Sequence, residues 1–558
     1  MSDPPARQSP HTPRAPQAPQ ASSAAGEVDQ QVIRSSRLMA LGTLASRATG
    51  FLRVAVLAFV LGTTSLADTY NIANVLPNIL YELLLGGVLT SVVVPLLVQA
   101  AATDEDRGEA YAARLLTLVA LSLGFVTVLA VFAAPLLTSL YGGQRGEHGQ
   151  LMTTFARLLL PQILLYGVGA TLGAILNTRG SFGAPMWAPV LNNLVVIASA
   201  VVYGLLPEPT DGSLMTTAQI LVLGGGTTLG IAVQTFALVP SLRRAGFRYR
   251  PRLDVRGMGL RSAGRLAGWV LLYVVANQLG YVVIVRLAEQ AYSFTTYFNA
   301  FMLFSLPHAV VAVSVITALM PQMSRHAVAG QLAELREDLA SGLRLAGVIL
   351  VPAAAVLIAL GPLIGTLIFA HGEVQLAEAR TIGLVLSGFA VGLVPFSAFQ
   401  LTLRAFYAQR DTRSPALTNV AVNAVNVLAA LALIAGLPEQ HRVVGLAVAH
   451  ATSYAAGLAI VTAVLRRRFP PAPQRTVLRT YVRLAVAAVP GTVLGAALAY
   501  WVFTHLDPGP AAAGAGLALG LPLAAALFPW CAGRVRVPEV AEVLGVLRGR
   551  LGRRALRS

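Results

Sequence analysis

Two arginines lie inside the first apolar segment of the chain, where a membrane helix normally carries no charge. Arg47 and Arg53 belong to the run SRATGFLRVAVLAFVLG. If this helix begins near Ser36, a rise of about 1.5 Å per residue puts Arg47 roughly 16 Å deep in a hydrocarbon layer about 30 Å thick. An arginine at that depth costs about 3 kcal/mol on insertion scales. We therefore expect both guanidinium groups to face a wet cavity that binds an anion.

A stripe of polar residues follows in the second apolar segment. Its members are spaced by three, four and four positions and would share one face of a helix: Asn71, Asn74, Asn78 and Glu82. We interpret the stripe as a lining of the cavity, with interhelical hydrogen bonding as the alternative. Glu82 would be a counter-ion for the arginines or a titrating group.

Later segments carry amides whose role the sequence leaves open. Asn277 and Gln278 lie in one apolar segment, and Asn419 and Asn423 lie in another. Cavity lining and helix packing explain these amides equally well. The sequence contains no nucleotide-binding P-loop, zinc-type His/Cys cluster or nucleophile elbow, so we expect neither an enzyme nor an ATPase, and no metal site or cofactor.

The composition places the whole chain in a membrane. Of its 558 residues 56% are hydrophobic and only 12% are charged, and the mean hydropathy is +0.68. The net charge of +17 comes from arginines that are dispersed among apolar segments. This dispersion argues against a basic domain that binds nucleic acid.

Fourteen apolar segments are long enough to be transmembrane helices. They lie near residues 36–62, 72–102, 112–140, 151–176, 187–206, 217–240, 262–288, 296–322, 341–361, 381–408, 414–436, 443–465, 479–504 and 511–533. Arginines concentrate in the tails and in every second loop, whereas the other loops hold only Arg145, Arg380 and Arg442. The positive-inside rule therefore predicts cytoplasmic termini. The outer loops are short, which disfavours a glycosyltransferase with an external domain.

An internal repeat divides the expected all-α fold into two lobes. The stretch 161–185 resembles 395–415: each opens with a proline, carries an arginine eighteen residues later, and precedes asparagines in the next helix. Because the offset is six helices, the two copies would have the same orientation in the membrane. We expect six units along the chain: a disordered tail at 1–34, an N-lobe at 35–240, a basic cytoplasmic linker at 241–265, a C-lobe at 266–465, two further helices at 466–533 and a basic tail at 534–558.

Several runs resemble the MurJ family, also called MviN, of lipid II flippases in the multidrug/oligosaccharidyl-lipid/polysaccharide exporter superfamily. They are SRATGFLR, ADTYNIANVLPNILYELLLGGVLTSVVVPLL, GAILNTRGSFGAPMWAPVLNN and FYAQRDTRSP. The resemblance implies two lobes in a V around a cationic cavity, with a groove for a polyprenyl tail at the last two helices. It also implies functional roles for Arg47, Arg53 and Asp68. A diphosphate suits two guanidinium forks.

The chain departs from this family at several cavity positions. Tyr81 and Glu82 stand where relatives often have arginines, and Gly86 stands where they have an acidic residue. Another family arginine would fall near Asn299 or Ala300. The acidic residues of the family's sodium site are missing from the expected helices at 262–288, 414–436 and 443–465. Their absence favours coupling to the membrane potential or to protons over coupling to sodium.

The leading hypothesis is a flippase of the bacterial cytoplasmic membrane that moves lipid II to the outer leaflet by alternating access. The alternatives are a flippase for another polyprenyl-diphosphate-linked glycan, of the O-antigen or capsule type, and a non-transporting scaffold of wall synthesis. Expected partners are lipid II, anionic phospholipid at the basic cytoplasmic loops, and wall-synthesis proteins.

Overall fold

The computed structural model describes most of the chain as helix. It covers residues 21–63, 65–83, 94–104, 106, 108–141, 146–210, 212–254, 264–469, 474–541 and 545. Within these ranges every regular element is helical and no β-strand occurs. Alanine and leucine, which favour helices, dominate the segments, and many helices are followed within one to three residues by glycine or proline.

The first half of the chain forms one group of helices, here called the N-lobe. Its elements are α1 (Ala21–Leu61), α2 (Ser65–Tyr81), α3 (Val94–Thr103), α4 (Glu109–Phe132), α5 (Ala134–Leu140), α6 (Glu147–Leu159), α7 (Gln162–Thr178), α8 (Gly183–Leu205), α9 (Thr217–Ile220), the π-helical turn η3 (Leu221–Gly225), α10 (Gly226–Phe236) and α11 (Leu238–Arg244).

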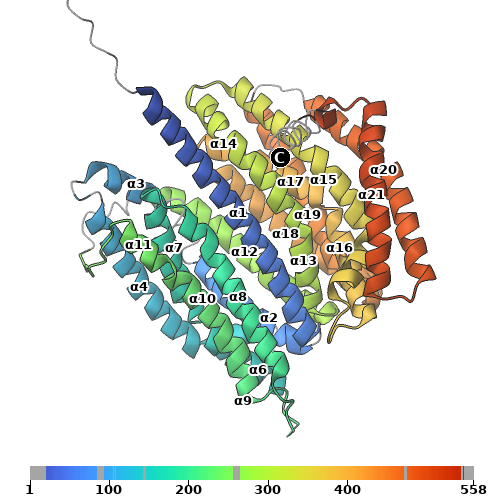
Figure 1. Ribbon diagram of the computed structural model, residues 1–558, viewed down its shortest axis with the longest axis horizontal. Coiled ribbons are helices and arrows are strands. Elements are labelled where there is room, and N and C mark those ends of the chain that lie inside the picture. Colours follow the sequence, from blue (N-terminus) through green and yellow to red (C-terminus); the bar gives the residue numbers. More distant parts are fainter. Residues whose placement is uncertain are drawn as a thin grey trace, which may run out of the picture.

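The second half forms the C-lobe and two further helices. The C-lobe contains α12 (Gly264–Ala291), α13 (Phe294–Pro307), the π-helical turn η4 (His308–Ala312), α14 (Val313–Val328), α15 (Leu332–Phe369), α16 (Leu376–Ala390), α17 (Leu393–Ala408), α18 (Arg413–Gly436), the 3₁₀ turn η5 (Glu439–His441) and α19 (Arg442–Arg468). The last two helices are α20 (Gln474–His505) and α21 (Pro510–Arg534). Figure 1 shows the two lobes side by side, with α20 and α21 at the edge of the C-lobe that lies away from the N-lobe.

The helices of the two lobes pack in the same pairs. In the N-lobe α1 packs on α8, α2 on α6, α4 on α7, and α10 on both α7 and α8. Six spans later α12 packs on α18, α13 on α16, α15 on α17, and α19 on both α17 and α18. This recurrence is the packing pattern that a parallel repeat requires.

Two matching spans are interrupted near their middle. The span of α6 and α7 breaks at Leu160 and Pro161, and the span of α16 and α17 breaks at Val391 and Gly392 with a bend of 48°. Proline lacks a backbone N–H and crowds the preceding turn, so a break at Pro161 is expected. In both lobes the break lies beside the helix that lines the space between the lobes, α2 or α13.

The structure contains most of the expected spans. Eleven described helices are long and apolar enough to cross a membrane, and two bent helix pairs raise the number to thirteen. The expected span at 72–102 runs through residues 84–93, which lie outside the described ranges. The chain is therefore a multi-pass membrane protein, while fourteen spans and cytoplasmic termini stay predictions.

The structure describes part of each segment outside the lobes. At the N-terminal end, α1 begins at Ala21, within the expected tail at 1–34. In the linker, residues 245–254 run along α4, where Arg248 N–H donates to Glu109 Oε1 at 3.1 Å. After α21, Glu539 forms an ion pair with Arg344 of α15 at 3.3 Å.

Candidate functional site

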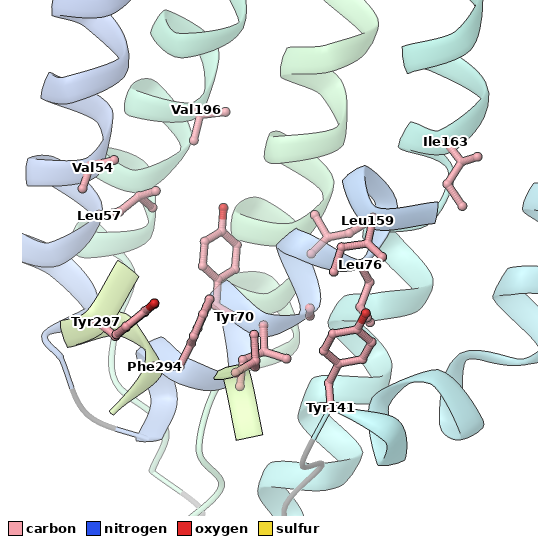
Figure 2. Packing of buried hydrophobic residues seen from close by; sticks show 14 of the residues in the cluster. Val54, Leu57, Tyr70, Leu76, Tyr141, Leu159, Ile163, Val196, Phe294 and Tyr297 are labelled. Carbon is pink, nitrogen blue, oxygen red and sulfur yellow. The ribbon is translucent and has the colours of Figure 1, made fainter. Parts of the chain in front are cut away.

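The arginine-bearing face of α1 lines a small cavity between the lobes. Arg53 contributes from α1, Asn71 and Asn74 from α2, and Thr295 and Asn299 from α13. Val54, Leu57, Tyr70 and Val196, all labelled in Figure 2, complete much of the wall. The cavity measures about 30 Å³, enough for about two water molecules. It is polar on one side and too small for a diphosphate in this conformation.

Asn299 gives this cavity an unsatisfied donor. Its side chain is only 3% exposed, and its Nδ2 has no hydrogen-bond partner. An unpaired buried amide costs free energy unless something else satisfies it. A water molecule or a ligand oxygen in the cavity would do so. Asn299 stands near the position where the family resemblance implies a further arginine.

Two further arginines, outside the lining of this cavity, lie near His308 of the C-lobe. Arg47 is exposed, six residues or about one and two-thirds turns before Arg53 on α1. The charges of Arg47 and of Arg404, on α17, both act on the imidazole of His308. Arg404 also lies over the ring of Tyr407, at 5.6 Å from its centroid. The sequence pattern missed Arg404 because it sits near the end of its apolar segment, where it resembles a loop residue.

Asp68 lies outside the cavity, in a contact between the lobes. Its carboxylate is 4% exposed and accepts three hydrogen bonds from the start of α13. Ser293 Oγ donates at 2.8 Å, Phe294 N–H at 2.9 Å and Thr295 N–H at 2.7 Å. Backbone N–H groups at a helix start lack partners within the helix and favour negative charge. Asp68 therefore clamps α2 of the N-lobe to α13 of the C-lobe.

Further bonds surround this clamp. Asn71 Nδ2 donates to Thr295 Oγ1 at 3.0 Å, and Thr63 Oγ1 donates to Glu378 Oε2 at 2.7 Å. Two more hydrogen bonds join the lobes: Glu373 N–H donates to Phe59 O at 3.0 Å, and Arg286 Nη2 donates to Ser139 O at 2.9 Å. We call the set formed by Phe59, Thr63, Asp68 and Asn71 with Ser293, Phe294, Thr295, Glu373 and Glu378 the lobe junction. Gly62, at a φ of 69°, ends α1 beside it.

The far end of the polar stripe separates from Arg53. Asn78 is exposed, and the ring of Tyr81 packs against Tyr166 with centroids 5.7 Å apart. Glu82 lines a second pocket of about 210 Å³ with aromatic residues of the C-lobe, among them Trp269 and Tyr407. Among the described residues Glu82 forms no ion pair with Arg47 or Arg53, and its role as their counter-ion stays a prediction. Gly86 lies outside the described residues.

The amides of the C-lobe hold two helices together. Asn277 Oδ1 on α12 accepts hydrogen bonds from Asn419 Nδ2 at 3.1 Å and Asn423 Nδ2 at 3.0 Å, both on α18. Asn419 Nδ2 also donates to Tyr273 O at 3.0 Å. The structure thus assigns these three asparagines to packing of α12 on α18 instead of cavity lining. Gln278 is half-buried on α12.

We expect Asn277→Ala to lower stability without impairing function. The change removes the acceptor of two interhelical bonds, which are worth roughly 0.6 kcal/mol each inside a membrane. The free energy of unfolding in a detergent titration should fall by about 1 kcal/mol, with activity per folded molecule unchanged. Gln278→Ala, one position along, is the matched control. Loss of activity in correctly folded Asn277→Ala protein would instead indicate that Asn277 lines the substrate cavity.

Comparison with known proteins extends these observations. The model of the family "Lipid II flippase MurJ" matches residues 57–507. The chain is 25% identical over 480 residues to a probable lipid II flippase MurJ of Haemophilus influenzae, covering 82% of this chain and 91% of the relative. It is 25% identical over 477 residues to the lipid II flippase MurJ of Burkholderia cenocepacia, covering 83% and 89%.

The chain belongs to the MurJ family.

Solved structures agree on the fold of this MurJ family member. A lipid II flippase MurJ in an inward closed conformation superposes with a TM-score of 0.70 at 18% identity, covering 88% of this chain and 97% of that one. A multidrug resistance MATE family transporter of the MOP superfamily, in an inward-facing conformation, gives a TM-score of 0.61 at 16% identity, covering 76% and 94%. The all-helical fold is thus shared between MurJ and MATE proteins.

Within this MurJ fold most of the expected site residues fall into three groups. Arg53, Asn71, Asn74 and Asn299 line the interlobe cavity, with Arg47 exposed farther along α1. Asp68 belongs to the lobe junction, and Asn277, Asn419 and Asn423 belong to helix packing. The junction partners Thr63, Ser293 and Glu378 carried no signal in the sequence, because single Ser, Thr or Glu residues at helix ends are common.

Proposed function

We propose that this protein is a lipid II flippase that binds the substrate diphosphate with cationic side chains between its lobes. The observation that carries the proposal is the position of Arg53 in the wall of the interlobe cavity, beside Asn71, Asn74 and the unsatisfied amide of Asn299. Guanidinium groups pair bidentately with phosphate oxygens. Membership in a family of lipid II flippases supports the same substrate.

The proposed orientation makes the lobe junction an outer gate. If the termini are cytoplasmic and the spans number fourteen, the segments at 62–63, 291–293 and 370–375 face the outside. The junction residues cluster at these loops. The conformation described would then be closed to the outside, while Glu82, Trp269 and Tyr407 line the cytoplasmic side of the interlobe space.

Alternating access would proceed by exchanging one set of polar contacts for another. The diphosphate enters from the cytoplasmic leaflet and brings the arginines of both lobes together around its oxygens. Closure on that side strains the lobe junction until the bonds from Ser293, Phe294 and Thr295 to Asp68 break. A ligand shifts such an equilibrium only by its difference in affinity for the two states. Arginines that approach each other only around the substrate provide this difference.

An apolar groove beside the C-lobe suits the polyprenyl tail. It has a volume of about 410 Å³ and lies between α15, α20 and α21. Its walls include Ile349, Val356, Leu521 and Phe528, and Val540 lies at one end. A long hydrocarbon chain held there would stay in an apolar environment while the head group crosses between the lobes.

The membrane potential is the proposed driving force, with proton coupling as the alternative. Moving one elementary charge across about 100 mV is worth about 2.3 kcal/mol. A cell interior that is negative favours outward movement of an anionic head group. Within the described part of the chain, no three His, Cys, Asp or Glu side chains lie close enough to hold a metal ion.

Translocation of fluorescent lipid II in proteoliposomes tests the proposal. Purified protein should move lipid II between leaflets faster than empty vesicles do, and an imposed potential of the right sign should raise the rate further. A vesicle with an O-antigen-type polyprenyl diphosphate in place of lipid II is the substrate control. Equal rates for both substrates would favour a broader glycan-lipid flippase, and no translocation of either would favour a scaffold of wall synthesis.

A further inference from the structure

A separate pocket with cationic and apolar walls lies away from the interlobe cavity at Arg53 and from the pocket at Glu82. It has a volume of about 230 Å³ and sits where the start of α15, the second half of α17, the end of α19 and the start of α20 meet. Its lining includes Arg336 and Arg466 together with Leu339, Leu343, Leu458 and Leu465. None of these residues lines the cavity at Arg53 or the tail groove.

The two arginines give this pocket a strongly cationic end. Arg336 is only 3% exposed, and its Nη1 donates to Phe469 O at 3.3 Å. Arg466, in the last turn of α19, is exposed and also lines the pocket. Two guanidinium groups at one pocket, one buried and one exposed, favour an anion with several acceptor oxygens.

The other walls exclude a small hydrated anion as the best occupant. Leucines from α15 and α19, together with Ala398 and Val477, make most of the lining apolar. The helix ends that meet here, including the start of α15 and the end of α19, are those the arginine pattern assigns to the cytoplasmic membrane surface. Leu478 is 67% exposed beside the pocket, on a surface suited to lipid.

We propose that this pocket binds one anionic phospholipid of the cytoplasmic leaflet. Arg336 and Arg466 hold the phosphate of the head group, and the leucine wall contacts one acyl chain. A lipid in this position touches four helices at once and ties α20 to the C-lobe. At the pocket, Tyr481 Oη of α20 already donates a hydrogen bond to Leu343 O of α15 at 2.8 Å. The proposal needs a bilayer but does not depend on which substrate is transported.

Lipid binding to delipidated, full-length protein tests this site by native mass spectrometry. Phosphatidylglycerol is titrated against phosphatidylethanolamine with the same acyl chains. We expect Arg466→Gln to weaken retention of phosphatidylglycerol about fivefold to tenfold, since each arginine near anionic lipid contributes on that order. Arg467→Gln removes the same charge one residue away, outside the pocket lining, and is the matched control.

A steric variant keeps the test independent of charge and folding. Thr462→Trp fills the pocket and leaves both arginines in place, whereas exposed Thr452→Trp on the same helix is its control. The proposal is supported if Thr462→Trp and Arg466→Gln lose phosphatidylglycerol while both controls retain it. It is overturned if all four variants bind alike, or if excess inorganic phosphate displaces the lipid from the wild-type protein. Failure of lipid II translocation in vesicles would leave this result unchanged.

Discussion

Arg53→Ala is expected to reduce lipid II translocation by at least about 100-fold while the protein still folds and inserts. Arg53 is half-buried and lines the interlobe cavity beside Asn71, Asn74 and Asn299. Removing one partner of a buried, hydrogen-bonded charge pair costs about 2–5 kcal/mol, and 2.7 kcal/mol is roughly 100-fold. The initial rate in proteoliposomes, normalised to the amount of inserted protein, measures the effect.

Two variants separate substrate binding from general damage. Arg53→Lys keeps the charge but loses the planar fork, so it should recover only part of the rate. Arg157→Ala removes an exposed arginine from another span, α6, and should retain the wild-type rate. An Arg47→Ala, Arg53→Ala double variant that still transports would show that the diphosphate binds elsewhere.

Asp68→Ala is expected to open the lobe junction and arrest the transport cycle. The substitution removes the acceptor of three hydrogen bonds and leaves the N–H groups of Phe294 and Thr295 without it. Bonds to a charged group contribute about 1.5–3 kcal/mol each, although water compensates part of this in the open state. A net shift of about 3 kcal/mol would change the ratio of closed to open protein by more than 100-fold.

Labelling from outside the cell measures this opening. Thr295 is 2% exposed in the closed junction, so Thr295→Cys in a Cys531→Ser background should react slowly with an impermeant maleimide. Adding Asp68→Ala should accelerate the labelling and abolish translocation. Asp507→Ala alters an exposed carboxylate in the loop after α20 and should do neither. Slow labelling in the Asp68→Ala protein would mean that Asp68 does not hold the junction shut.

Much of the architecture could be predicted from the residues because the bilayer simplifies the problem. In hydrocarbon each backbone group must bond within its own helix, so a long apolar segment has few alternatives to a transmembrane helix. All the expected spans other than 72–102 match a helix or a bent helix pair in the described part. Likewise, the cost of burying Arg53 indicated a polar cavity before its partners were known.

Roles that depend on which helices meet could not be predicted in this way. The stripe from Asn71 to Glu82 follows one helix face, but α2 meets different neighbours along its length, so Asn71 reaches Thr295 while Glu82 reaches a pocket with Trp269. Asn277 and Asn74 are the same residue type in similar apolar surroundings. Only the approach of α18 made Asn277 a packing residue.

The sequence alone determined the membrane class, nearly all the spans and the presence of a polar cavity at Arg53, since these follow from hydropathy and from the cost of burying charge. The tertiary structure decided that Asp68 clamps the lobes, that Asn299 lines the cavity at Arg53, and that Arg336 and Arg466 meet in a separate pocket. Each of these depends on contacts between segments far apart in the chain. Such contacts are set by helix packing, which local residue patterns do not encode.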